Sequence, residues 1–272
     1  MAKTFGLPFK TPAYRGRVRP AYNKAGLIGF FEDSHTLLLD PETEILQKGR
    51  NLVGAVHVSG QETGSLEVVI KEFSPRGIDK IKGRILPSKA LRAWRGAEAL
   101  VRLGVGTPEP ILYLEERKRS AGRSYYISLR LSDVREIRSL FLSASETVLR
   151  PFLHQLAGNL RRWHSQGLLH RDLSDGNILL GSGEEEPRFF LTDTNRIRIL
   201  SSIGPSRGIK NLIRLGVPEP LQKAFVGSYL EKDPIPRRYW IWYRLAKKSF
   251  SSYLRLKKIL RVKKIARKLG LQ

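Results

Sequence analysis

The stretch Leu168–Leu179, with the sequence LLHRDLSDGNIL, decides which fold can be expected for this chain. The polar side chains between its apolar ends include His170, Asp172 and Asn177. A second apolar run, residues 189–192, ends directly before Asp193, and the residues between the two runs are mostly glycine and charged residues. This order predicts a polar loop followed by a β-hairpin, with an acid at the end of the returning strand.

The sequence before this stretch has the pattern of a small sheet with one helix. Apolar residues through residues 44–73 indicate antiparallel strands, and the last strand ends on Lys71. Residues 88–103 carry apolar side chains at helical spacing, and residues 111–129 show a second pair of strands around a polar turn. Beyond the sheet the character changes, because residues 146–165 have the pattern of a long amphipathic helix.

These patterns predict an α+β chain with the two-lobed, protein-kinase-like fold: a small antiparallel β-sheet lobe with one helix, and a mainly helical lobe. At 272 residues the chain is long enough for both lobes. The expected domains are a basic irregular arm over residues 1–40, the first lobe over 41–132, the second lobe with the polar loop over 133–236, and a basic amphipathic helical segment over 237–272.

The order of the polar residues suits phosphoryl transfer, in which the protein mainly positions the reactants and offsets the charge of a polyphosphate. We expect Lys71 to contact the phosphates of ATP, and Asp172 to orient the acceptor hydroxyl and accept its proton. Asn177 and Asp193 offer the hard oxygen atoms that Mg²⁺ prefers, and His170 is expected to brace the loop backbone. A polar turn and an ordinary strand-end lysine would explain each residue singly, but their shared spacing favours a catalytic site.

Three further residues are weaker candidates for nucleotide binding. Glu98 is the only acid of the helix expected at 88–103, so it is that helix's candidate partner for Lys71, while a solvent-facing glutamate is the alternative. Gly49 and Gly54 flank an incomplete version of the glycine loop that covers phosphates in kinases. Turn glycines would explain both equally well.

In these residues the chain resembles the bacterial lipopolysaccharide kinase (Kdo/WaaP) family of the protein-kinase-like superfamily. The resemblance covers about residues 45–215 and is carried by the loop at 168–179, LTDTNR at 191–196, RAWR at 92–95 and GVGTPEP at 104–110. It implies ATP-dependent, Mg²⁺-assisted phosphorylation of a sugar hydroxyl of the lipopolysaccharide inner core or a related glycolipid. The implied location is cytoplasmic, at the inner face of a Gram-negative inner membrane.

By matching positions, the resemblance carries the ATP, base and Mg²⁺ roles to Lys71, Asp172, Asn177 and Asp193. The sequence also departs from the pattern of Ser/Thr protein kinases. Ser174 stands where those kinases usually carry a lysine, Thr194-Asn195 replace Phe-Gly, and no Ala-Pro-Glu segment follows. A glycan acceptor is therefore favoured over a peptide.

The chain is strongly basic, since 49 lysines and arginines against 25 aspartates and glutamates give a net charge of +24. No acid follows Asp233, and basic residues interleave with aromatic and aliphatic ones over residues 237–272. Such a helix would bind an anionic membrane surface, where each Lys or Arg contributes about 1 kcal/mol. A final helix packed on the second lobe is the alternative, and nucleic acid is a third possible partner, because basic and aromatic residues also suit RNA.

Two rival functions stay open from the sequence. The charge allows an atypical RNA-associated protein kinase or ATPase, whereas Thr194-Asn195 and the sparse glycine loop allow a nucleotide-binding pseudokinase scaffold. The chain has no cysteine, and residues 1–10 lack the apolar core of a secretory signal. These two features exclude a disulfide framework and favour a cytoplasmic protein.

Overall fold

A computed structural model describes residues 5–49, 51–60, 64–75, 86–117, 122–181 and 187–268, with the side chains of the last helix described as far as Leu260. The chain forms two compact units. The first contains Met1–Val134 and Leu179–Ile197, and the second contains Arg135–Ile178 and Arg198–Gln272. The first crossing, after Val134, lies close to the boundary expected after residue 132, but the segment 179–197 groups with the first unit.

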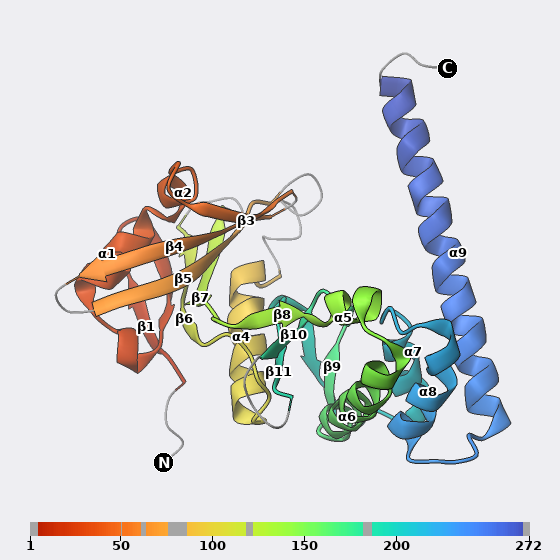
Figure 1. Ribbon diagram of the computed structural model, residues 1–272. Coiled ribbons are helices and arrows are strands. Elements are labelled where there is room, and N and C mark those ends of the chain that lie inside the picture. The colour runs from red at the N-terminus through yellow and green to blue at the C-terminus, as the bar shows by residue number, and fades with distance from the viewer. Residues whose placement is uncertain are drawn as a thin grey trace. The chain divides into compact units, whose positions relative to one another are not determined.

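The first unit is built on an antiparallel sheet that, in the described residues, has seven strands in the order β1-β2-β6-β7-β5-β4-β3 (Figure 1). The strands are β1 (Leu7–Lys10), β2 (Tyr14–Val18), β3 (Glu44–Lys48), β4 (Leu52–Gly60), β5 (Gly64–Phe73), β6 (Pro110–Glu116) and β7 (Ser124–Leu129). The sheet is thus larger than the sequence pattern suggested, because two strands lie N-terminal to the expected lobe.

Residues 1–40 were expected to be irregular, and that expectation is wrong for the described part. Strands β1 and β2 are followed by a 3-10 turn η1 (Pro20–Tyr22) and by helices α1 (Ala25–Glu32) and α2 (Ser34–Leu37). Pro8 lies in β1, which is an edge strand and tolerates a missing N–H donor. Gly16 lies where a Cβ atom would be 1.9 Å from the carbonyl oxygen of Tyr113, so this glycine permits close strand pairing.

The two faces of this sheet are covered by different helices, and this places Lys71. Leu27 and Phe31 of α1 share a buried cluster with Ile70. The helix α4 (Lys89–Arg102) packs through Trp94 and its neighbours against the other face, in a second cluster that includes Phe73. Since successive side chains of a strand point to opposite faces, Lys71 lies on the α4 face. Helix α4 begins as expected, with the Ser88 hydroxyl accepting a hydrogen bond from the Leu91 N–H (3.0 Å).

The expected hairpin is formed by β10 (Ile178–Gly181) and β11 (Phe189–Leu191), which belong to a small sheet of order β11-β10-β8 with β8 (Val134–Glu136). Strand β11 is tied to the first unit, because the Leu191 N–H donates to the Gly106 carbonyl oxygen (2.8 Å). The Thr107 hydroxyl donates to the carbonyl oxygen of Leu191 (2.9 Å). The 3-10 turn η2 (Thr194–Arg196) follows β11 and leads into β12 (Ile197–Ile199).

The second unit is mainly helical, as expected. Its helices are α5 (Ile137–Ser143), α6 (Glu146–Ser165), α7 (Pro205–Leu212), η3 (Glu219–Leu221), α8 (Gln222–Leu230) and α9 (Arg237–Lys268). Helix α6 spans the residues that the periodicity predicted, and its apolar side is buried. A short strand β9 (Leu168–His170) leads from α6 into the polar loop and pairs with β12.

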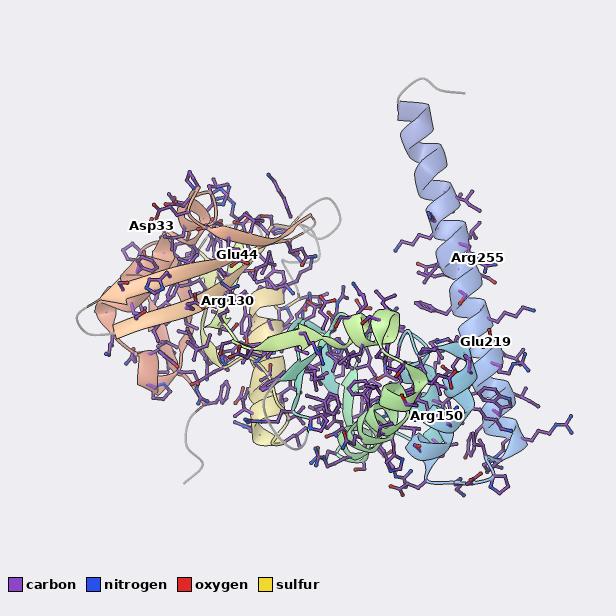
Figure 2. All side chains as sticks on the ribbon, in the orientation of Figure 1. Asp33, Glu44, Arg130, Arg150, Glu219 and Arg255 are labelled. Atoms are coloured by element: carbon purple, nitrogen blue, oxygen red, sulfur yellow. The ribbon has the colours of Figure 1, made fainter. Side chains whose placement is uncertain are left out.

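Helix α9 packs on the second unit through one side only. At 100° per residue, Tyr243, Lys247 and Phe250 share the inner side, where Tyr243 is fully buried. Leu245 and Leu256 lie on the opposite, outer side and are 59% and 56% exposed. Figure 1 shows α9 continuing beyond α7 and α8, and Figure 2 shows Arg255 on that continuing part. Over the described residues no helix is both long and apolar enough to cross a membrane.

Candidate active site

Lys71 and Asp193, separated by 122 positions in the sequence, form an ion pair inside the first unit. The Lys71 ammonium donates to Asp193 Oδ1 at 2.5 Å, and the two side chains are only 18% and 19% exposed. The Lys71 ammonium also lies over the Phe73 ring, 5.5 Å from its centroid. The structure thus brings together the expected phosphate-binding lysine and the expected metal-binding aspartate.

The backbone at Asp193 is specialised. Asp193 has φ 51° and ψ 45°, in the left-handed region that only a few per cent of residues other than glycine adopt, with Asp among the more tolerant types. This residue caps η2, and the Arg196 Nε atom approaches its Oδ2 at 3.5 Å. The Asn195 amide nitrogen, with the amide oriented to satisfy both groups, donates to Asp193 Oδ1 (2.7 Å). Such a bend at the end of a strand turns the carboxylate out of the β-ladder and toward positive groups.

Helix α4 holds this bend through small residues rather than through an acid. The Thr194 hydroxyl donates to the Ala93 carbonyl oxygen (2.9 Å). Gly96 lies one turn further on, where a Cβ atom would be only 2.0 Å from the carbonyl oxygen of Thr194. The helix backbone therefore lies directly against the residue that follows Asp193, and a side chain of any size at position 96 would separate them.

Glu98 does not take the place expected for it. Its carboxylate forms an ion pair with Arg102 on its own helix, four residues on (2.6 Å), while Lys71 pairs with Asp193. The expected Lys71–Glu98 pair is therefore not formed in the described structure. The physical reason is that the α4 side facing η2 carries Ala93 and Gly96, and Glu98 lies elsewhere on the helix.

The two glycines of the expected phosphate loop have different surroundings. Gly49 lies just after β3, where a Cβ atom would meet nothing within 4 Å, and residue 50 lies outside the described residues. Gly54 lies in β4, where a Cβ atom would come within 2.7 Å of the Thr43 side chain and 2.8 Å of Leu38. Packing within the lobe is thus a sufficient reason for Gly54. Nucleotide contact by either glycine stays a prediction.

Asp172 and Asn177 are joined in the second unit. The Asn177 side-chain NH₂ group donates to the Asp172 carbonyl oxygen (2.8 Å), which closes the polar loop. The Asp172 carboxylate forms an ion pair with the guanidinium of Arg214. Arg214 lies 42 positions later, and no pattern in the sequence pointed to it. Since the Asn177 nitrogen bonds the loop, its Oδ1 atom is the one that a cation could use.

His170 is a scaffold residue, as expected. Its ring Nδ1 atom accepts a hydrogen bond from the Asp172 N–H (3.2 Å), and its carbonyl oxygen accepts one from the Asn211 side-chain NH₂ group (2.9 Å). Asn211 in turn accepts from His164 Nε2 (3.1 Å), which leaves His164 Nδ1 to accept from the Tyr229 hydroxyl (2.8 Å). This series of hydrogen bonds from Tyr229 through His164 and Asn211 to His170 holds the loop in place.

Burial shifts the pKa values of two groups in this series, His164 and Tyr229. Desolvation lowers the pKa of His164, with a smaller opposing effect from its hydrogen bond to Asn211, so the imidazole is neutral at pH 7. Burial also raises the pKa of Tyr229 to about 12, with Arg161 acting in the opposite direction. Both side chains therefore act as neutral hydrogen-bonding groups that position Asn211.

The donor set is compatible with Mg²⁺. In the described residues no group of three or more His, Cys, Asp or Glu side chains could hold a metal ion. Mg²⁺ commonly takes only one or two protein oxygen ligands and completes its octahedron with phosphate oxygens and water. Asp193 in the first unit offers a carboxylate oxygen, and Asn177 in the second unit offers an amide oxygen; each is of a type that Mg²⁺ takes.

Comparison with known proteins agrees with this arrangement of residues. A model of the lipopolysaccharide kinase (Kdo/WaaP) family matches residues 82–217, half of the chain. A solved structure titled "WaaP in complex with acyl carrier protein" aligns with this chain at a TM-score of 0.57 and 16% sequence identity. The alignment covers 80% of this chain and 91% of that chain, and it shows the protein-kinase-like fold. Human serine/threonine-protein kinase ULK1 is 53% identical over 38 residues, which are 14% of this chain and 4% of that protein, so the chain spans a small part of its length.

Proposed function

This chain belongs to the lipopolysaccharide kinase (Kdo/WaaP) family, and from that premise we propose that it transfers the γ-phosphate of ATP to a sugar hydroxyl of a lipopolysaccharide core or related glycolipid. The enzyme class follows from the family: it is a kinase. The observation that supports the proposal most directly is the Lys71–Asp193 ion pair, which holds a cation and a carboxylate together on the α4 face of the sheet.

The residues of the first unit would bind the donor. Lys71 would contact the phosphates of ATP, as the matching lysine does in protein kinases, and Asp193 would offer its carboxylate to a cation. Asp193 and Asn177 are the residues that would offer oxygen atoms to Mg²⁺, and the ion would supply positive charge against that of the phosphates. Arg196, whose Nε atom lies 3.5 Å from Asp193 Oδ2, would offer the carboxylate a second positive partner when Lys71 contacts the nucleotide.

Asp172 would act on the acceptor. Its carboxylate would accept the proton of the sugar hydroxyl. The hydroxyl oxygen would bond to the γ-phosphorus, and the bond between that phosphorus and the β–γ bridging oxygen would break, which leaves ADP. Because the transition state of phosphoryl transfer is loose, orientation of the hydroxyl contributes more than basicity. The bracing of the loop by His170, Asn211 and Asn177 serves that orientation.

The acceptor would be a glycan rather than a peptide. Ser174 removes the lysine that protein kinases carry in this loop, and Thr194 uses its hydroxyl to bind α4 instead of presenting the aromatic ring of a Phe-Gly pair. Family membership points the same way, to a lipopolysaccharide-related substrate.

A lipid-linked acceptor would be reached at a membrane surface, and α9 supports this part of the proposal. Leu245 and Leu256 are 59% and 56% exposed on its outer side, Leu260 is 58% exposed near its far end, and no acid occurs after Asp233. Exposed leucines among lysines and arginines would give such a helix both apolar and electrostatic contacts with an anionic headgroup region. The alternative considered above, a final helix packed on the second unit, holds for the first part of α9, where Tyr243 is buried and Lys247 and Phe250 contact Leu215 and Arg214. Leu245 and Leu256 take no part in that packing, because they lie on the other side of the helix.

Two experiments test the proposal. Purified chain with Mg²⁺ and ATP labelled on the γ-phosphate should transfer label to purified lipopolysaccharide core, and Asp172→Ala and Asp193→Ala should each lower the rate at least about 100-fold. Glu146→Gln, which removes a surface charge at the start of α6, is the control and should keep the wild-type rate. Full activity in either aspartate variant would refute the assigned site.

The second experiment addresses the membrane. The chain should sediment with vesicles that contain anionic phospholipid and not with neutral vesicles, and the double variant Leu245→Ser, Leu256→Ser should bind several-fold more weakly. Salt-sensitive binding to RNA with no binding to either vesicle would instead favour a nucleic-acid partner.

A further inference from the structure

Arg214, which no sequence motif marks, contacts the proposed catalytic base. It lies between α7 and η3, and its guanidinium forms an ion pair with Asp172 Oδ1. Both side chains are partly exposed, 39% for Arg214 and 34% for Asp172, so the pair lies at the edge of the loop where an acceptor must approach. A guanidinium has five N–H donors in a fixed plane, and it restricts the rotation of a carboxylate that it contacts.

Helix α9 holds Arg214 from the other side. The Arg214 Cζ atom lies 5.0 Å from the centroid of the Phe250 ring, within the range of a cation–π contact. Lys247, one turn before Phe250, donates from Nζ to the carbonyl oxygen of Leu215 at 2.8 Å. Burial lowers the pKa of Lys247, with Asp175 acting in the opposite direction, which agrees with a lysine that is partly removed from water.

The base of α9 is itself firmly anchored. Tyr243 is fully buried, and the Trp242 indole N–H donates to the Ser206 carbonyl oxygen at the start of α7 (3.1 Å). Residues 214 and 215 therefore lie between the catalytic loop on one side and an anchored helix on the other. A continuous series of contacts leads from Phe250 through Arg214 to Asp172, all within the second unit.

We propose that Arg214, held by Phe250 and Lys247 of α9, is a positioning residue that orients the Asp172 carboxylate toward the acceptor hydroxyl. The inference rests on the proposed function and extends it, because it makes α9 a structural part of the catalytic loop in addition to a surface for lipid. Arg214 acts through Asp172 and does not itself take the proton.

The test is a double-mutant cycle with the transfer assay to lipopolysaccharide core. Arg214→Ala should lower kcat about 10- to 100-fold, as expected when a reacting group is misplaced by about 1 Å, and leave the KM for ATP unchanged. In an Asp172→Asn background the same substitution should lower kcat less than about 2-fold, because its effect passes through the carboxylate. Phe250→Ala should lower kcat less than Arg214→Ala does, and Phe250→Tyr, which keeps the ring, should restore it.

Arg207→Ala, which removes an exposed arginine of the neighbouring helix α7, is the matched control and should keep the wild-type kcat. The inference would be overturned if Arg214→Ala lowered kcat by the same factor in the Asp172→Asn background as in the wild type. A wild-type kcat in Arg214→Ala would also overturn it. A wild-type chain that transfers no phosphate to the acceptor would refute the proposed function and the inference together, whereas an active wild type with an unaffected Arg214→Ala refutes the inference alone.

Discussion

Replacing Gly96 by alanine should damage the site from a position that touches no substrate. The new Cβ atom would lie 2.0 Å from the Thr194 carbonyl oxygen, whereas Cβ atoms essentially never come closer than 3.0 Å to such an atom, so two backbones must separate by about 1 Å. Overpacking of this kind costs about 1–3 kcal/mol. For a chain of this size, about 2 kcal/mol corresponds to a Tm lower by about 4–8 °C.

The displaced residue directly follows Asp193, so activity should fall further than stability. A misplacement of about 1 Å in a catalytic group can cost about 100-fold in rate. Thermal unfolding and steady-state transfer, measured on the same preparations, separate the two effects at a temperature where both proteins are folded. Gly158→Ala is the matched control, since this glycine also lies in a helix but a Cβ there would meet nothing within 4 Å. It should gain about 0.5–1 kcal/mol of stability and keep its rate. A Gly96→Ala variant with wild-type Tm and kcat would show that α4 does not hold Asp193 as described.

Three other predictions follow from individual contacts. Lys71→Met should lower kcat/KM for ATP at least about 100-fold, because Lys71 pairs with Asp193 at the site. Glu98→Gln should change kcat/KM less than about 3-fold, because Glu98 pairs with Arg102. Equal losses of activity in the two variants would instead favour the expected Lys71–Glu98 pair. Asn211→Ala should cost about 1–3 kcal/mol in urea unfolding, since it removes the hydrogen bonds that Asn211 makes with the His170 carbonyl oxygen and the His164 ring; an unchanged midpoint would contradict this series of hydrogen bonds. Because burial lowers the pKa of His164 below 6.5, the unfolded chain binds this proton first as the pH falls, so stability should decline with falling pH from about pH 7 down to the lowered pKa, by at most about 1.4 kcal/mol per pH unit. His164→Gln should show a shallower decline between about pH 7.5 and 5.5, and identical slopes would argue against this role.

Features that depend on local sequence were predictable. Helix α6 and helix α4 follow from apolar periodicity, and the Ser88 cap and the β10–β11 hairpin follow from short-range signals. The support of the loop by His170 could also be predicted, because Asp172 bonds the ring only two residues away. The loop motif is compact in sequence because its residues position one another.

Features that depend on distant segments were not predictable in the same way. Glycine and proline in residues 1–40 suggested irregular structure, but Gly16 permits contact with Tyr113 almost a hundred residues later, and Pro8 lies on a sheet edge. Lys71 pairs with Asp193, and the side of α4 that faces Thr194 carries Ala93 and Gly96 rather than Glu98. Arg214 contacts Asp172 from 42 positions later in the sequence, and Phe250 and Lys247, which contact Arg214 and Leu215, lie on the still more distant α9.

Helix α9 also links two surfaces by rotational phase. A single uninterrupted helix fixes its inner contacts, at Lys247 and Phe250, relative to the exposed apolar residues beyond them, Leu256 and Leu260. Each residue added to a helix turns everything beyond it by about 100° and advances it by about 1.5 Å. One residue inserted between Phe250 and Leu254 would leave the contacts of Lys247 and Phe250 intact and would rotate Leu256 and Leu260 by more than a quarter turn. Seven inserted residues make close to two full turns, so they would nearly restore the direction of these leucines about 10 Å further along the helix. The helix therefore sets the angle at which the catalytic loop would face a surface bound by its far end.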